Sequence, residues 1–134
     1  MSDISDKINR IENLWKAGGC SEQQLSDAQQ ALGMVFPPEY AAYLREFGCI
    51  DFFATEWTGL HIDGNCNVVS MTLRERELND NFPPKMLALE NAGIDGIIIT
   101  VDESGAVYKV QYDSCEKISD SISEYLDRCI ARKK

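Results

Sequence analysis

The sequence is poor in the side chains that enzymes use for acid–base and nucleophilic chemistry. Its 134 residues include one histidine, His61, and no nucleophile elbow of the form G-x-S-x-G. Carboxylates are paired twice, as Glu75 with Glu77 and as Asp102 with Glu103. The first pair alternates with arginines, as on a solvated face, and the second falls in a predicted turn. We therefore predict that the chain has no catalytic residues and is not an enzyme.

Sequence signals for a bound metal or cofactor are also missing. The cysteines are odd in number, widely spaced and form no C-x-x-C pair: Cys20, Cys49, Cys66, Cys115 and Cys129. The chain has no glycine-rich phosphate loop, and the two glycines within 93–96 are explained by a turn between strands. We predict reduced thiols, with Cys129 on an apolar helix stripe, and neither metal nor cofactor.

Positive charge is scarce. Thirteen Lys and Arg stand against 22 Asp and Glu, which gives a formal net charge of −9 and repels nucleic acid and anionic membranes. A charged partner would therefore be basic, although an acidic composition can also serve solubility alone. No segment resembles a membrane span, and the N-terminal stretch MSDISDKINR is polar, unlike a signal peptide. We expect a cytoplasmic protein that binds neither nucleic acid nor membranes directly.

The most specific segment that is present runs from residue 32 to 48, LGMVFPPEYAAYLREFG. Gly33 suits the left-handed position just after a helix end, and Pro38 suits the first turn of the next helix. The tyrosines and apolar residues that follow recur at helical spacing, and Gly48 ends the element. The segment therefore predicts two helices joined by a short proline-containing link.

This pattern resembles the SUKH superfamily of SMI/KNR-type domains, whose motif has LG, then LP, then a tyrosine-rich helix and a closing glycine. Residues 86–112 resemble the later block of the family, in which strands, an acidic loop and a hairpin precede a C-terminal helix. The resemblance covers most of the chain. The sequence departs from the pattern at Phe36, where leucine is usual, and at Phe47, where asparagine is common.

Helical periodicity marks both ends of the chain. One apolar stripe predicts a first helix that ends near Gly18 and carries Ile4, Ile8, Ile11 and Trp15. Ser21 and Gln24 have the spacing of a capping box, which predicts a second helix to Leu32. A second stripe predicts a C-terminal helix that carries Ile118, Ile122, Leu126, Cys129 and Ile130.

Strand patterns fill the middle of the chain. We predict one or two short strands in 51–63, including His61, a strand over 66–72, a short helix over 73–79, and strands over 86–89, 97–101 and 106–112. The last two strands are expected to form an antiparallel hairpin. The order predicts a single α+β domain over residues 1–134, with an antiparallel or mixed β-sheet packed by N-terminal helices and a C-terminal helix.

The family resemblance also implies a function. SUKH domains in bacteria look mostly like immunity proteins that bind and neutralise toxins, often nucleases, whereas similar fungal domains act as regulatory adaptors in cell-wall synthesis. An immunity role agrees with the net charge of −9, since nuclease toxins are commonly basic. We expect a basic cognate toxin as the partner, with an intracellular adaptor or scaffold as the alternative. The sequence leaves open whether the protein is a monomer or a homodimer.

Candidate partner-binding residues follow the closing glycine of the motif. Large aromatics beside acids can anchor an interface with a basic partner. This pattern and the acidic stretch 90–95 give the predicted partner-binding residues Asp51, Glu56, Trp57, Glu90 and Asp95. For Trp57 a place in the core is an equally good explanation, and for Phe52 and Phe53 the core is favoured.

Overall fold

The computed structural model describes residues 3–53, 55–62 and 64–131, and these residues form an α+β fold, as predicted. The helices are α1 (Asp3–Asn9), α2 (Glu22–Leu32), α3 (Pro38–Glu46), α4 (Val68–Leu78) and α5 (Ile122–Ala131), with a short 3-10 turn η1 (Gly64–Cys66). The strands are β1 (Trp15–Lys16), β2 (Ile50–Phe52), β3 (Thr55–Glu56), β4 (Met86–Asn91), β5 (Ile97–Asp102), β6 (Val107–Gln111) and β7 (Ser114–Ser119).

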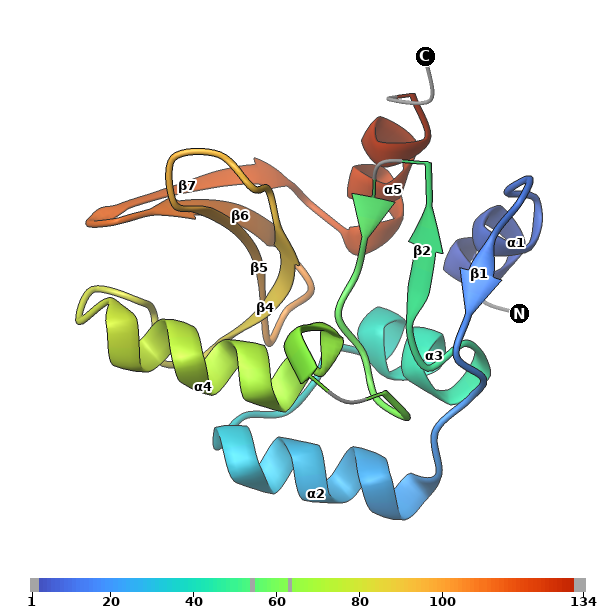
Figure 1. Cartoon of the computed structure of the whole chain (residues 1–134), viewed down its shortest axis with the longest axis horizontal. Coiled ribbons are helices and arrows are strands. Elements are labelled where there is room, and N and C mark those ends of the chain that lie inside the picture. Colours follow the sequence, from blue (N-terminus) through green and yellow to red (C-terminus); the bar gives the residue numbers. More distant parts are fainter. Residues whose placement is uncertain (1–2, 54, 63, 132–134) are drawn as a thin grey trace.

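The strands form two antiparallel sheets (Figure 1). The larger has the order β4-β5-β6-β7, and the smaller has the order β1-β2-β3. Helix α4 covers one face of the larger sheet, where Met71 packs against Ala88, Ile98 and Val110. Residues of α3 and α5 share the main core with the other face of that sheet. The larger sheet is therefore enclosed between helices, and the smaller sheet lies beside α1 and α5 (Figure 1).

The helices on either side of the LG motif form as predicted. The capping box is complete, because the Ser21 hydroxyl accepts from the Gln24 N–H at 3.1 Å and the Gln24 amide oxygen accepts from the Ser21 N–H at 2.9 Å. Gly33 takes the left-handed conformation, with φ 64°, just after α2. Pro38 occupies the first position of α3. These local signals need no tertiary context, which explains why the sequence alone identified them.

The predicted first helix is too long. Helix α1 ends at Asn9, and Asn13 then adopts a left-handed conformation with φ 58°, which asparagine tolerates better than most residues. Trp15 consequently lies on strand β1, where half of its side-chain surface is exposed. It does not continue the apolar stripe of Ile4 and Ile8, which are both fully buried.

The predicted strand over 66–72 is wrong, since these residues enter a helix. The Asn67 side chain caps the start of α4 by accepting from the Val69 and Ser70 N–H groups at 3.0 and 3.1 Å. A single helix from Val68 to Leu78 thus replaces the predicted strand and short helix. His61 also lies outside any strand, exposed and with a left-handed φ of 64°.

The larger sheet contains the predicted strands and one more. Strand β5 is buried as expected, and it pairs with β6 in an antiparallel hairpin. Strand β7 was not predicted from the sequence, and it adds an edge strand that pairs with β6. Ile118 therefore belongs to β7, and the C-terminal helix begins at Ile122. Exposed polar residues dominate β7, which hid its strand character.

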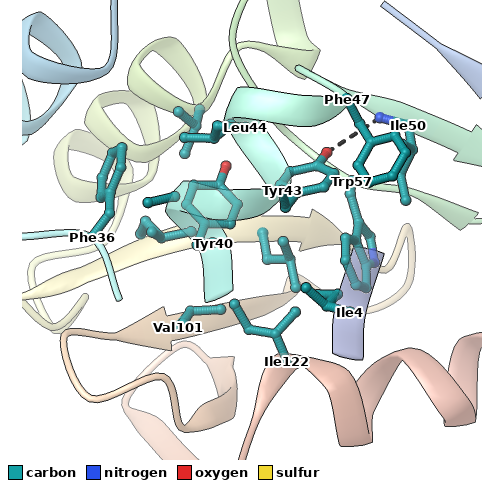
Figure 2. Packing of buried hydrophobic residues seen from close by; sticks show 14 of the residues in the cluster. Ile4, Phe36, Tyr40, Tyr43, Leu44, Phe47, Ile50, Trp57, Val101 and Ile122 are labelled. Atoms are coloured by element: carbon teal, nitrogen blue, oxygen red, sulfur yellow. Dashed lines mark hydrogen bonds between the residues drawn. The ribbon is translucent and has the colours of Figure 1, made fainter. Parts of the chain in front are cut away.

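The tyrosines of the motif join the two sheets. The Tyr43 hydroxyl donates to the Thr58 carbonyl at 2.8 Å. It also accepts from the Ile50 N–H at 3.2 Å (Figure 2). The Tyr40 hydroxyl lies 3.1 Å from the Thr58 hydroxyl, which itself donates to the Ala88 carbonyl at 2.7 Å. Burial raises the pKa of both tyrosines, so they remain neutral donors. Helix α3 thereby fixes the position of β2 relative to β4.

Two glycines allow close backbone contact behind the small sheet. A Cβ atom at Gly59 would overlap the carbonyl oxygen of Gly48, and one at Gly48 would overlap that of Gly18. The Gly48 carbonyl also accepts from the Leu60 N–H at 2.8 Å. These contacts hold the chain after β3 against the end of α3.

Candidate functional site

One face of the small sheet points to solvent and carries the candidate site. Trp15 lies opposite Asp51 and Asp51 lies opposite Glu56, so the three side chains form a row across β1, β2 and β3. We call this row the acidic face. The alternation of the strands buries Ile50 and Phe52 behind it.

A hollow of about 630 Å³ opens beside this row, between the small sheet and the end of β4. We call it the acidic hollow, and its lining is Asp51, Phe53, Glu56, Glu90, Asn91, Ala92 and Ile94. Phe53 and Ile94 are exposed large apolar residues at its border, with 38% and 62% of their surface accessible. The hollow thus combines carboxylates with accessible apolar surface, as protein interfaces do.

A smaller hollow of about 300 Å³ lies on the other side of the acidic face. Trp15, Asp51 and Glu56 border it, with Cys49 and Cys66 among its other lining residues. Burial, the neighbouring Cys66 thiol and the Glu56 and Asp51 carboxylates raise the pKa of Cys49 to about 12. Burial and the same two carboxylates also raise the pKa of Cys66. Both thiols therefore stay protonated near neutral pH, and neither has the character of a nucleophile.

The two carboxylates at the centre lack a counter-ion within the part of the chain that the structure describes. Asp51 and Glu56 stand directly opposite each other, and no described Lys, Arg or His side chain forms an ion pair with either. Among the residues that the structure describes, no basic residue lines either of the two hollows. Arg74 lies farther along, in a third hollow of about 320 Å³ that also includes Glu56. Like charges facing each other on adjacent strands destabilise a sheet.

The predicted residue Trp57 lies in the core. Its side chain is fully buried, stacks on Tyr125 with 6.3 Å between ring centroids, and meets Tyr43 edge-on at 5.6 Å. Its neighbours in β3 alternate, so Glu56 points outward where Trp57 points inward. The structure thus settles the two explanations for Trp57 in favour of the core.

Glu90 lines the acidic hollow but is 4% exposed. Its carboxylate accepts from the Tyr125 hydroxyl at 2.8 Å and lies 3.9 Å from the Cys129 sulfur. The cause is a register shift between Ala88 and Glu90, which places Glu90 opposite Ile99 and on the core face of β4. Regular alternation after Leu89 would have turned Glu90 to the face of the sheet on which Ala88 and α4 lie.

Asp95 remains at the surface but outside the lining of the acidic hollow. It occupies the turn between β4 and β5 with a left-handed φ of 50°. Its carbonyl accepts from the Gln111 side chain at 3.0 Å. The neighbouring Ile94 reaches the hollow instead. Of the five predicted residues, Asp51, Glu56 and Glu90 are brought together, whereas Trp57 and Asp95 are not.

Sequence reasoning missed Trp15 and Ile94 as members of this surface, and it favoured the core for Phe53, which is instead exposed. Trp15 matched a helical stripe, and its exposure depends on where α1 ends. Asn13 within the predicted helix was the available signal, because asparagine favours turns and left-handed conformations. No local signal distinguishes exposed Phe53 from buried Phe52 except the alternation of β2.

The described residues contain no group of three or more His, Cys, Asp or Glu side chains arranged to hold a metal ion. Among the same residues, no helix has the length and apolar character required to cross a bilayer. The structure therefore defines an α+β domain with an acidic face that borders two hollows, one of them lined by the half-exposed Trp15.

Comparison with known families agrees with this architecture. The profile of a SUKH family, SUKH_5, described as SMI1-KNR4 cell-wall, matches residues 1–131. The chain belongs to this family, because the match covers nearly its whole length. No curated protein matches the chain.

Proposed function

We propose that this chain is an immunity protein that binds a cognate bacterial toxin and neutralises it without chemistry. In this proposal the acidic face and the acidic hollow cover a basic surface of the toxin. The supporting observation is the pair of opposed carboxylates, Asp51 and Glu56, which have no described counter-ion and border both hollows. A basic partner would supply the missing charge.

Electrostatic attraction would make the protein and its toxin associate rapidly. The net charge of −9 attracts a basic protein over several ångströms, and opposed charges raise association rates well above those of neutral pairs. Apolar contact would then slow dissociation, because exposed aromatic residues supply much of the binding energy at interfaces. Trp15, Phe53 and Ile94 provide that contact around the carboxylates.

The test is inhibition of the toxin encoded by the adjacent gene. Purified protein should abolish the toxin activity at equimolar concentration, and the double variant Asp51→Asn/Glu56→Gln should require a much higher concentration. Asp113→Asn is the matched control, because Asp113 is an exposed acid in the distant turn between β6 and β7. Toxin activity that persists in excess wild-type protein would reject the proposal.

A regulatory adaptor is the second candidate. It is favoured by the description of the matched family, which refers to the cell wall. An adaptor would use the same kind of surface but would bind proteins of the host cell. A native pull-down that recovers housekeeping proteins, with no toxin gene beside the coding sequence, would favour the adaptor over the immunity protein.

A further inference from the structure

We propose that the acidic face is a docking site for an arginine side chain of the partner protein, which stacks on Trp15 and donates to Asp51 and Glu56. This inference deepens the proposed function and rests on it for a partner that is a protein. It adds the chemistry of the contact: an arginine, rather than a lysine or general positive charge.

The order of the three side chains across the small sheet suits a planar cation. Trp15, Asp51 and Glu56 are direct neighbours on adjacent strands, and strands lie about 4.8 Å apart in a sheet. Trp15 and Glu56 are therefore two strand spacings apart, with Asp51 between them. An arginine that enters from solvent would meet the half-exposed indole and the Asp51 carboxylate one strand apart, and the longer Glu56 side chain could reach it from the next strand. A guanidinium is planar, stacks on aromatic rings and carries five N–H donors in a fixed fork.

A lysine side chain fits the acidic face less well than an arginine side chain. An ammonium group is a compact, strongly hydrated charge without a flat face, so it gains less from Trp15. It also donates without the paired geometry that carboxylates accept from a guanidinium. The arrangement of one ring beside two acids therefore discriminates between the two cations.

Among the described residues, no Lys or Arg side chain of the chain itself lies against the acidic face. Lys16 follows Trp15 in β1, but its ammonium group lies on the other face of the strand, 5.9 Å from the centre of the Phe47 ring. Arg74 lines the third hollow and neither of the two that Asp51 borders. The negative charge of the row is felt in its surroundings, because Glu56 and Asp51 help to raise the pKa of both nearby thiols.

The site also has room and an apolar border. The hollow of about 300 Å³ between Trp15 and Cys66 is open to one long side chain, and the larger acidic hollow lies next to it. Phe53 and Ile94 border the larger hollow. We expect the residue beside the arginine in the partner to be apolar, since it would cover these two side chains.

The test uses three acetylated tripeptide amides, tri-arginine, tri-lysine and tri-citrulline, titrated into the full-length protein. Binding is followed through the indole N–H signals in NMR spectra, with the Trp15 signal identified by Trp15→Phe. Tri-arginine should shift the Trp15 signal and leave that of buried Trp57 unchanged. Its affinity should exceed that of tri-lysine by about fivefold, which corresponds to an exposed cation–π contact. Neutral tri-citrulline should not bind.

Variants separate this site from general attraction to an acidic protein. Glu56→Gln and Trp15→Ala should each weaken tri-arginine binding about fivefold, whereas Asp113→Asn and Tyr112→Ala should change it less than twofold. Tyr112 is the matched aromatic control, since it is exposed in the distant β6–β7 turn. Equal binding of tri-arginine and tri-lysine, or equal effects of Glu56→Gln and Asp113→Asn, would overturn the inference.

The two proposals fail in different ways. If the toxin is neutralised but Trp15→Ala and Glu56→Gln leave its affinity unchanged, the arginine site is wrong and the immunity role stands. If tri-arginine binds as described but no toxin is neutralised, the site stands and the immunity role is wrong.

Discussion

The polar groups of helix α3 are hydrogen-bonded within the fold, whereas the carboxylates on the outer face of the small sheet have no described counter-ion. Inside, the hydroxyls of Tyr40 and Tyr43 both find partners at Thr58, although the rings are completely buried. Outside, Asp51 and Glu56 face each other with no described counter-ion. The buried groups are paired because an unpaired polar group in the core would destabilise the fold.

The contrast separates residues that are paired within the fold from the carboxylates to which we assign a binding role in the proposal above. The motif features around α3 have structural roles: Gly33 ends α2 in a left-handed conformation, Pro38 starts α3, and the tyrosines contact Thr58. The opposed carboxylates have none, and they slightly weaken the sheet that carries them. Substitutions in the two regions should therefore have different consequences.

The largest effect is expected from Gly59→Ala. A Cβ at this position overlaps the Gly48 carbonyl, so the backbone must move, and we expect a loss of about 3 kcal/mol in the free energy of unfolding. Urea denaturation measures it. Gly33→Ala is the control, since its Cβ meets nothing within 4 Å and only the left-handed φ is strained, which costs about 1 kcal/mol. Equal losses would contradict the close contact.

The next largest losses of stability are expected at the two buried tyrosines of α3. Tyr43→Phe removes the acceptor for the buried Ile50 N–H as well as a donor to Thr58, and should cost about 2 kcal/mol. Tyr40→Phe should cost about 1 kcal/mol, because the Thr58 carbonyl keeps Tyr43 and the Thr58 hydroxyl keeps Ala88. Thermal and urea unfolding check both. A larger loss for Tyr40→Phe would show that the network is wrongly assigned.

The acidic pair should show the reverse behaviour. Asp51→Asn/Glu56→Gln should leave stability unchanged or raise it by about 0.5 kcal/mol, since like charges no longer face each other. Glu22→Gln is the matched comparison, because the Glu22 carboxylate forms an ion pair with Arg45 at 2.7 Å and its loss should lower stability. Both are measured by urea denaturation at low salt. A clear loss of stability in the double variant would assign the pair a structural role.

The smallest effect concerns the Cys66 thiol. Burial and the carboxylates of Glu56 and Asp51 raise its pKa, so Glu56→Gln should lower that pKa and increase the thiolate fraction at a given pH. The rate of alkylation at Cys66, followed by mass spectrometry from pH 7 to 10, should therefore rise. Cys115 is the internal control, because burial alone raises its pKa. An unchanged Cys66 rate would mean that the charge of Glu56 does not reach this hollow.

Much of the fold could be predicted from local chemistry. The capping box, the glycine after α2, the proline at the start of α3 and the buried strand β5 all depend on residues that are close in sequence. Asp51 and Glu56 were chosen as binding residues because they are acids beside large aromatics, and the structure places them side by side on adjacent strands.

The remaining features depend on contacts that are distant in sequence or on irregular backbone. Glu90 is turned inward by a bulge in β4 and is stabilised there by Tyr125, which is 35 positions away. Trp15 pairs with Asp51 across the small sheet, so the apolar spacing of residues 4–15 did not show its exposure, although Asn13 was a signal that the helix ends before it. Asn67 begins a helix through its side chain inside a segment that otherwise resembles a strand.

The most direct test of the central claim is oxidative footprinting of the protein alone and in complex with its cognate toxin. Trp15 is half exposed and Tyr112 is 63% exposed in the free protein, so both should be oxidised. They belong to β1 and to the β6–β7 turn, which lie on opposite sides of the molecule (Figure 1). We expect the toxin to protect Trp15 and Phe53 and to leave the oxidation of Tyr112 unchanged. Protection of Tyr112 with Trp15 still oxidised would contradict the assignment of the acidic face as the binding surface.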